Sequence, residues 1–335
     1  MTRPWLIPVG GFLGAGKTTL ILAAARTLAA RGLKCAAIMN DQAGDLVDTA
    51  FVETHGLRTG EVTGGCFCCR FSELIEAADH LRTLSPDVIF LEPVGSCTDL
   101  SATILQPLKH DFANQYRLAP LTVVVNPART ADLADPDIAF LHERQCAEAD
   151  LLFVNGPADS ASSALSEVCV AAWLDAILSN TLPVGAKLLT IDYEQYARAE
   201  AALGWLNWSA TVEVSPALSP SSLVGPFLDD LQQSLHAANA RIAHLKLFDQ
   251  TPTSYLKAAF TSNSGDPTVE GDLTASPETS HSLRLNLRAV IDPAPLRALF
   301  SQALTQLPGV RSDENLQCFS PSPPRPEHRY AEVVS

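Results

Sequence analysis

The sequence has few positive charges. It carries 23 lysine and arginine residues against 37 aspartate and glutamate residues, which gives a formal net charge of −14. A surface this acidic repels the phosphodiester backbone, so we expect no general binding of nucleic acid. A single nucleotide is a different case, because backbone N–H groups at a helix N-terminus can bind its phosphates against the overall field.

Long apolar runs are also missing. No uninterrupted apolar stretch reaches the roughly 18 residues that a membrane-spanning helix needs, so we expect no membrane partner. The apolar segment 5–15 lacks a cleavage region and continues into Lys17 and a helical pattern, which argues against a secretory signal. Eight cysteines in a chain of 335 residues without such a signal argue against a disulfide framework and for a cytoplasmic location.

Short β-rich runs alternate with helical patterns through residues 1–192. Several runs are continuously hydrophobic, as in strands buried on both faces of a parallel sheet. The alternation predicts an α/β fold, a P-loop NTPase with a mostly parallel, doubly wound sheet. We expect strands at 5–9, 35–39, 87–91, 121–125, 151–154 and 187–191, and helices at 17–30, 72–84, 138–148 and 164–179.

The pattern changes after residue 192. Residues 193–222 end in a serine- and proline-rich stretch that predicts a connector. Residues 223–310 show a helix, three strands and a helix, which predicts a small α+β domain with a polar loop at 262–280. The proline-rich composition of residues 311–335 predicts a disordered tail.

A phosphate-binding loop lies between the first predicted strand and helix. The run Gly11-Phe-Leu-Gly-Ala-Gly-Lys17-Thr18 satisfies the pattern G-x-x-x-x-G-K-[ST] in that context. Its glycines let the backbone wrap the phosphates, Lys17 would neutralise the β- and γ-phosphates, and the Thr18 hydroxyl would ligate Mg²⁺. The predicted nucleotide-binding residues here are Gly11, Gly14, Ala15, Gly16, Lys17, Thr18 and Thr19.

A carboxylate follows the hydrophobic run 87–91. Glu92 ends that run and is followed by Pro93-Val94-Gly95. An acid at this place orients Mg²⁺ or its water, and a glycine N–H just beyond it can respond to the γ-phosphate. The sequence therefore predicts Lys17, Glu92 and Gly95 as catalytic residues, with Thr18 and Glu92 as the magnesium ligands.

Three cysteines lie within four residues, at Cys66, Cys68 and Cys69. Two preceding glycines allow a tight turn, and the following helix N-terminus and Arg70 are expected to lower the thiol pKa values. Thiolates select Zn²⁺, Cu(I) or related soft ions, and three sulfurs leave one tetrahedral position for an exchangeable partner. A redox role and plain packing are the alternatives. The candidates for a fourth ligand are Asp41, Asp45, His55 and Cys97.

These motifs together resemble the CobW-like metallochaperone GTPases, P-loop proteins related to the hydrogenase and urease nickel chaperones. The resemblance rests on segments 10–19, 65–69 and 92–95, and more weakly on 40–48, and it covers about residues 4–192. It implies GTP hydrolysis with Mg²⁺, zinc or a related ion on the cysteines, and delivery of metal to a client metalloprotein or cobalamin-related protein. Asp41 stands where the family has glutamate and joins the three cysteines as a predicted metal ligand.

The sequence departs from that family at the expected guanine-binding motif. The family reads the base with Asn-Lys-x-Asp, whereas segment 151–159 keeps Asn155 and Asp159, lacks the lysine and has one residue more. Both residues are predicted to bind the base, and the choice between GTP and ATP stays open. The eight histidines are not clustered, which argues against bulk metal storage.

Three functions compete at this stage. In the first, a metallochaperone or insertase, the cysteines lie between two nucleotide-responsive segments, so nucleotide state would change metal affinity by about 5–150-fold. The second is a metal or redox sensor that binds nucleotide without turnover. The third is a small-molecule P-loop kinase with a structural zinc knuckle. The physiological metal, the client and the oligomeric state, a homo-oligomer included, are left open.

Overall fold

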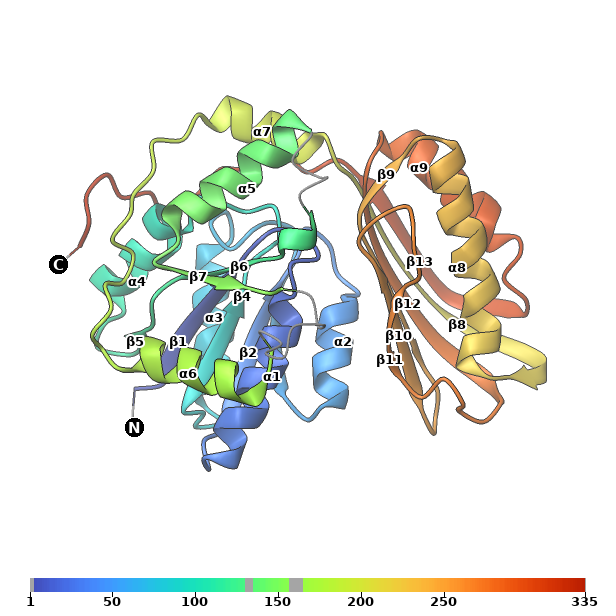
Figure 1. Cartoon of the computed structure of the whole chain (residues 1–335), viewed down its shortest axis with the longest axis horizontal. Helices are drawn as coiled ribbons and strands as arrows, with labels where there is room; N and C mark the ends of the chain where they lie inside the picture. The colour runs from blue at the N-terminus through green and yellow to red at the C-terminus, as the bar shows by residue number, and fades with distance from the viewer. Residues whose placement is uncertain (1–2, 130–134, 157–164, 335) are drawn as a thin grey trace. The chain divides into compact units, whose positions relative to one another are not determined.

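The chain divides into two compact units. A computed structural model describes residues 3–129, 135–156 and 165–334. Unit 1 comprises residues 1–42, 52–199 and 323–335, and unit 2 comprises residues 43–51 and 200–322. Figure 1 shows the parallel sheet of unit 1 and the antiparallel sheet of unit 2. In the described residues, no helix is long and apolar enough to cross a membrane.

Unit 1 is built around a parallel sheet. In its described part, six strands follow the order β3-β2-β4-β1-β6-β7, and a seventh, β5, pairs with β1. The strands are β1 (Trp5–Gly10), β2 (Cys35–Asn40), β3 (Arg58–Val62), β4 (Val88–Glu92), β5 (Arg117–Leu118), β6 (Thr122–Val125) and β7 (Leu151–Val154). The helices are α1 (Lys17–Ala30), α3 (Phe71–Arg82), a π-helix at Ser101–Leu105, α4 (Gln106–Asp111), α5 (Pro136–Glu148), α6 (Glu167–Leu178) and α7 (Tyr193–Ala201). The predicted α/β fold with a parallel sheet is confirmed.

Strand order brings two predicted motifs to one edge of this sheet. β1 pairs directly with β4 in parallel register, with Pro8 opposite Leu91. The phosphate loop follows β1 and Glu92 ends β4, so both lie at the carboxyl ends of neighbouring strands. Ligands of open α/β sheets bind in the crevice outside these strand ends.

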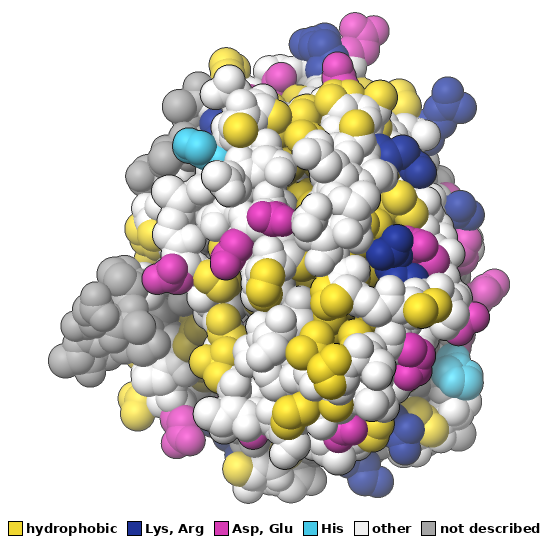
Figure 2. Space-filling model, turned by 90° about the vertical axis from the view of Figure 1, so that its right-hand side faces the viewer, with side chains coloured by type: hydrophobic (Ala, Val, Ile, Leu, Met, Phe, Trp, Pro, Cys, Tyr) yellow, Lys and Arg dark blue, Asp and Glu magenta, His cyan; other side chains and the backbone are white. Residues whose placement is uncertain are grey.

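Unit 2 is an antiparallel sheet with two helices. Within the described residues the strand order is β11-β10-β9-β12-β8-β13. The elements are β8 (Gly204–Leu218), α8 (Pro220–Ala237), β9 (Arg241–Gln250), β10 (Tyr255–Phe260), β11 (Thr268–Gly271), β12 (Glu278–Val290), α9 (Pro293–Leu304) and β13 (Val310–Phe319). Helices α8 and α9 cover one face of the sheet and bury Phe227 and Phe300 against Trp208. On the face seen in Figure 2, apolar, acidic and basic side chains are interspersed, so the net negative charge is not gathered there.

The segment 43–51 belongs to unit 2, although it lies in the sequence between two strands of unit 1. It includes most of α2 (Val47–Thr54). Its backbone is held by two asparagines: Asn207 Nδ2 donates to Gly44 O at 2.8 Å, and Val47 N donates to Asn286 Oδ1 at 2.9 Å. Its side chains are held as well, because Asp48 pairs with Lys246. The switch-like segment 40–48 is therefore divided between the two units after Gln42.

Several predicted elements need correction. Residues 187–191 form no strand. Side chains take up backbone groups along this stretch: Arg329 donates to Leu189 O, and just before it the Asp150 carboxylate accepts from Gly185 N and Ala186 N. Residues 193–222 are no connector, since they form α7, β8 and the start of α8. The serine- and proline-rich stretch caps that helix, with Ser219 Oγ accepting from Ser222 N.

The predicted loop and the predicted tail are also ordered elements. Within 262–280, β11 pairs with β10. Residues 310–319 form β13, which pairs with β8. Residues 323–335 belong to unit 1, and their amide groups donate hydrogen bonds to it. The proline content predicted disorder. Proline has no backbone N–H, but the other residues of this segment do, and those N–H groups make the hydrogen bonds that hold it.

Glu148 anchors the segment that follows Gly95. It ends α5, is fully buried, and accepts hydrogen bonds from Thr98 Oγ1 at 3.0 Å and Ser101 N at 3.1 Å. Burial raises the pKa of this carboxyl from 4.5 to about 8, against the opposing effect of its hydrogen bonds. An acid whose pKa is higher in the folded state stabilises the protein below its unfolded pKa, and that contribution is lost as the pH rises through the folded value.

We therefore expect Glu148→Gln to remove a pH-dependent loss of stability. Between about pH 4.5 and about pH 8, the free energy of unfolding of the wild type should fall relative to the variant by an amount on the order of a few kcal/mol. Urea unfolding at a series of pH values measures this difference. Glu143→Gln, on the exposed face of the same helix, is the matched control. A difference between wild type and variant that stays constant with pH would contradict the assignment.

Candidate nucleotide and metal site

The phosphate loop depends on backbone conformations that favour glycine. Gly11, Gly14 and Gly16 have φ angles of 133°, 72° and 100°, in the left-handed half of φ space where a Cβ is strained. A Cβ on Gly11 would also lie 2.4 Å from the carbonyl oxygen of Val124 in β6. The loop therefore packs directly on the neighbouring strand, and α1 begins at Lys17.

Lys17, Thr18 and Glu92 meet at the start of α1. Thr18 Oγ1 donates to Glu92 Oε1 at 3.0 Å, and Lys17 Nζ lies 4.0 Å from the same oxygen. All three are buried, with 7%, 3% and 6% of their surfaces exposed. Thr18 and Glu92 are 74 residues apart in the sequence, and together they offer the hydroxyl and carboxylate oxygens that suit Mg²⁺.

Gly95 lies against the phosphate loop. A Cβ on Gly95 would be 3.0 Å from Leu13 N and 2.8 Å from Leu13 Cδ2, so a larger residue here requires the Leu13 side chain to move and the loop backbone to give slightly. The Gly95 carbonyl accepts a hydrogen bond from Gln145 Nε2 at 3.0 Å. The structure thus brings the third predicted catalytic residue to the loop, while Ala15 is buried in it and Thr19 is exposed in the first turn of α1.

Asn155 also contacts the phosphate loop. Its Nδ2 donates to the Ala15 carbonyl at 3.0 Å and would lie 2.4 Å from a Cβ on Gly16. The residue follows β7 and ties this strand end to the loop. Asp159 lies outside the described residues, so base recognition stays a prediction.

The three cysteines form one cluster. Their sulfur atoms all lie within 4.8 Å of one another, with Cys66 Sγ 3.2 Å and Cys68 Sγ 3.7 Å from Cys69 Sγ. Cys66 and Cys68 are each 1% exposed, and Cys69 is half-buried. A turn brings them together, because Cys69 N and Arg70 N both donate to the Cys66 carbonyl before α3 begins at Phe71. Sulfur ligands in this arrangement can hold a soft metal ion.

Asn40 holds the cysteine loop in place. It ends β2, and its Nδ2 donates to Val62 O and Gly65 O, both at 2.8 Å. Its Oδ1 accepts from Phe67 N at 2.8 Å. Sequence reasoning did not assign Asn40 a role. The available signal was its position as the first residue of the family-like segment 40–48.

Hydrogen bonds within the cluster shift the pKa values of its thiols in opposite directions. Hydrogen bonds from Cys68, Cys69 and Cys97 lower the pKa of Cys66 well below its usual value. Donation to Cys66 raises the pKa of Cys68, and that of Cys69 to about 11. Arg70 does not act as predicted, because its guanidinium pairs with Glu73 at 2.9 Å. Metal binding would therefore release protons from the neighbouring thiols.

The candidate fourth ligands are separated by the fold. Cys97 hydrogen-bonds with Cys66 and is 1% exposed. The Asp45 carboxylate lies in unit 2, where it accepts from Ser209 Oγ and Asn315 Nδ2. Among the described residues, neither the Asp41 carboxylate nor the Cys97 sulfur joins the group of ligand atoms within 4.8 Å of one another. Cys97 does contact one sulfur of the cluster, that of Cys66.

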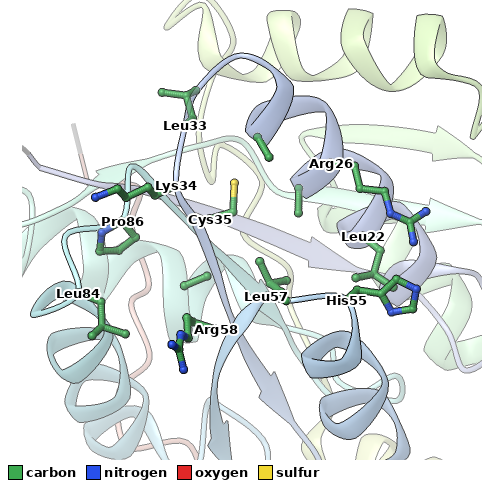
Figure 3. A pocket seen from close by; sticks show the side chains of 14 residues that line it. Leu22, Arg26, Leu33, Lys34, Cys35, His55, Leu57, Arg58, Leu84 and Pro86 are labelled. Carbon is green, nitrogen blue, oxygen red and sulfur yellow. The ribbon is translucent and has the colours of Figure 1, made fainter. Parts of the chain in front are cut away.

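His55 lines a separate cavity of about 520 Å³, shown in Figure 3. Cys35 and Arg58 line it too, and they begin β2 and β3. The cavity therefore lies at the amino ends of these strands, whereas the phosphate loop lies at the carboxyl ends. Burial raises the pKa of Cys35 to about 12, so this thiol is not a ready metal ligand.

Comparisons with known proteins agree with the motifs. A family model described as the CobW/HypB/UreG nucleotide-binding domain matches residues 6–179. Urease accessory protein UreG of Ureaplasma parvum is 37% identical over 114 residues, which are 31% of this chain and 54% of UreG. Zinc chaperone YeiR of Escherichia coli is 36% identical over 99 residues, 28% of this chain and 29% of YeiR. The matched region thus spans about half or less of the length of these relatives.

Among solved structures, Zn(II)-bound YjiA GTPase from E. coli aligns over 92% of this chain and all of its own. The sequence identity is 15% and the TM-score 0.30.

Replacing Asn40 with Ala should loosen the cysteine loop. The variant loses three hydrogen bonds to buried backbone groups, each worth about 0.5–1.5 kcal/mol. We expect faster reaction of Cys66 and Cys68 with a thiol reagent under native conditions, measured by mass spectrometry of labelled peptides. Asn263→Ala is the matched control, because Asn263 also bridges two backbone groups, in unit 2. Equal labelling rates in wild type and Asn40→Ala would show that Asn40 does not hold the loop.

Proposed function

The chain belongs to the CobW/HypB/UreG nucleotide-binding domain family, and on this premise we propose that it is a GTP-hydrolysing metallochaperone. Its nucleotide state would control the binding and release of zinc or a related transition metal. The metal is cargo, passed on to a client metalloprotein or a cobalamin-related protein.

One observation carries this proposal: a single short segment contacts both functional groups. Gly95 packs against Leu13 of the phosphate loop, and Cys97, two residues later, hydrogen-bonds with Cys66. Gln145 Nε2 donates to the carbonyls of both Gly95 and Cys97, at 3.0 and 2.9 Å. A shift of Gly95 would therefore move a group in contact with the sulfur cluster.

The chain's own residues take the roles expected of a P-loop hydrolase. Lys17 would neutralise the phosphates, and the turn Gly11–Gly16 would present backbone N–H groups to them. Thr18 Oγ1 and the Glu92 carboxylate would hold Mg²⁺, whose charge stabilises the phosphate oxygens when it is bound. Glu92 would also position the attacking water. Asn155 would keep the loop in shape through Ala15.

The functions named for two relatives support the choice of cargo. YeiR is a zinc chaperone and UreG a urease accessory protein. Three thiols suit zinc better than a hard ion.

A metal sensor is the second candidate function, because Cys66 and Cys68 are almost completely buried. Buried ligands favour retention of a metal over its transfer. Nucleotide binding without hydrolysis would favour the sensor function over the metallochaperone function.

Lys17→Ala should lower GTP turnover by about 10²–10³-fold, because it removes a positive charge from the phosphates. Phosphate release at saturating GTP measures this, with ATP in a parallel series to test base preference. Lys34→Ala is the control, since Lys34 is exposed on the same unit. Undiminished turnover in Lys17→Ala would exclude this loop as the hydrolytic site.

Zinc affinity should depend on the nucleotide. We expect dissociation constants to differ by about 5–150-fold between protein bound to GDP and protein bound to a non-hydrolysable GTP analogue. A competitive chelator assay gives both values. Replacing Cys66, Cys68 and Cys69 together with serine should remove zinc binding and leave nucleotide affinity nearly unchanged. Equal zinc affinity in the empty, GDP and GTP-analogue states would refute the coupling.

A further inference from the structure

We propose that Cys97 is the fourth sulfur ligand of the metal site. The inference rests on the proposed function, because it takes the three-cysteine cluster as a metal site. It changes the predicted chemistry: four sulfurs make a closed site, whereas three leave one position open. It also makes the segment after Gly95 part of the metal site itself.

The position of Cys97 supports this assignment. Its thiol hydrogen-bonds with Cys66, and both residues are 1% exposed, so this contact is made inside the protein. In a tetrahedral zinc site with Zn–S bonds of about 2.3 Å, neighbouring sulfurs are separated by roughly 3.8 Å. The separations of 3.2 and 3.7 Å from Cys66 and Cys68 to Cys69 Sγ are close to this value, whereas the Cys97 sulfur lies outside the group of sulfurs within 4.8 Å of one another. Binding of an ion by all four sulfurs would therefore require the Cys97 side chain to move toward Cys68, Cys69 or both.

The backbone around Cys97 is held in place. Its N–H donates to Val94 O at 3.0 Å, and its carbonyl accepts from Gln145 Nε2 at 2.9 Å. Gln145 is 2% exposed in α5 and also binds Gly95. Displacement of Gly95 by a nucleotide would therefore move a metal ligand directly. An all-sulfur site would favour Zn²⁺ or Cu(I) over harder ions.

Cobalt substitution tests the ligand count without relying on turnover. In Co(II)-loaded protein, Cys97→Ser should lose about a quarter of the sulfur-to-metal charge-transfer absorption, one thiolate of four. X-ray absorption at the zinc edge should count four sulfurs in the wild type and three in the variant. Cys146→Ser, a half-buried cysteine of α5, is the matched control.

A wild-type site with three sulfurs and one oxygen or nitrogen, unchanged in Cys97→Ser, would overturn the assignment. Nucleotide-dependent zinc affinity in that same protein would leave the proposed function standing, so the two failures are distinguishable.

A separate set of contacts carries a second inference: we infer that residues 325–334 form a strap that closes the cysteine site. Arg325 N donates to Cys69 Sγ at 3.1 Å, and Glu327 N donates to the Cys68 carbonyl at 2.9 Å. The Glu327 carboxylate accepts from Ser72 N and Ser72 Oγ at the start of α3. The His328 ring packs edge-on against Phe71, with centroids 5.1 Å apart.

The strap continues onto the segment that follows Cys97. Arg329 Nε pairs with the Asp99 carboxylate at 2.7 Å, and Tyr330 N donates to Ala102 O at 3.0 Å. Val334 N donates to Gln106 Oε1 at 2.7 Å. The strap thus joins the cysteine loop to the segment 97–106. Exchange of metal with another protein would require the strap to move away, because the Arg325 N–H donates to the partly exposed sulfur of Cys69.

The double variant Glu327→Ala/Arg329→Ala should release the strap. Loss of charge-assisted bonds at both points should accelerate thiol labelling of Cys69 and zinc transfer to a chelator by about tenfold or more. Glu332→Ala, an exposed change in the same segment, is the control. Amide hydrogen exchange of residues 325–334 should rise in the double variant alone. Faster exchange there with unchanged labelling and transfer rates would show that the segment does not gate the site.

Discussion

The contact of Gly95 with the phosphate loop is the constraint on which the rest of the site depends. A Cβ on Gly95 would force Leu13 to shift. The contact lies between Glu92 at the end of β4, which meets Lys17 and Thr18, and Cys97, which hydrogen-bonds with Cys66. The stretch from Glu92 to Cys97 therefore contacts two kinds of group: the residues expected to bind phosphate and magnesium, and the sulfurs expected to bind a soft metal ion.

A second link passes through β2. Asn40 fixes the cysteine loop with three hydrogen bonds, and from Ala43 to Phe51 the chain packs within unit 2. The chain therefore runs directly from the end of β2, which holds the cysteine loop, into unit 2. An ion pair, Asp48 with Lys246, and two asparagine contacts to the backbone hold this segment. Phe51 at its end is 1% exposed and packs edge-on against Phe248 and Tyr255. Apolar packing and polar contacts therefore both fix the segment in unit 2.

The elements predicted well were those with strong local signals. Helix α1 has the predicted bounds, because a glycine and a regular apolar pattern mark its start. Strands β3 and β13 were missed, since most of their residues are not fully buried and their pairing partners are distant in sequence. The prolines near residues 215–226 and 321–326 led to two wrong predictions, a connector and a disordered tail. Pro220 of the first group begins helix α8, and those of the second lie in a segment that hydrogen-bonds to unit 1.

By itself the sequence determined the chemistry of this protein. The phosphate loop, the carboxylate after β4 and the three cysteines are local patterns, and residue type and spacing suffice to define their possible ligands. Tertiary structure decided which groups meet: Thr18 with Glu92, Cys97 with Cys66, Asp45 with unit 2, and the C-terminal segment with Cys69. Those pairings join residues up to 256 positions apart. Strand order and packing determine which of these residues come into contact, and no local sequence pattern specifies either.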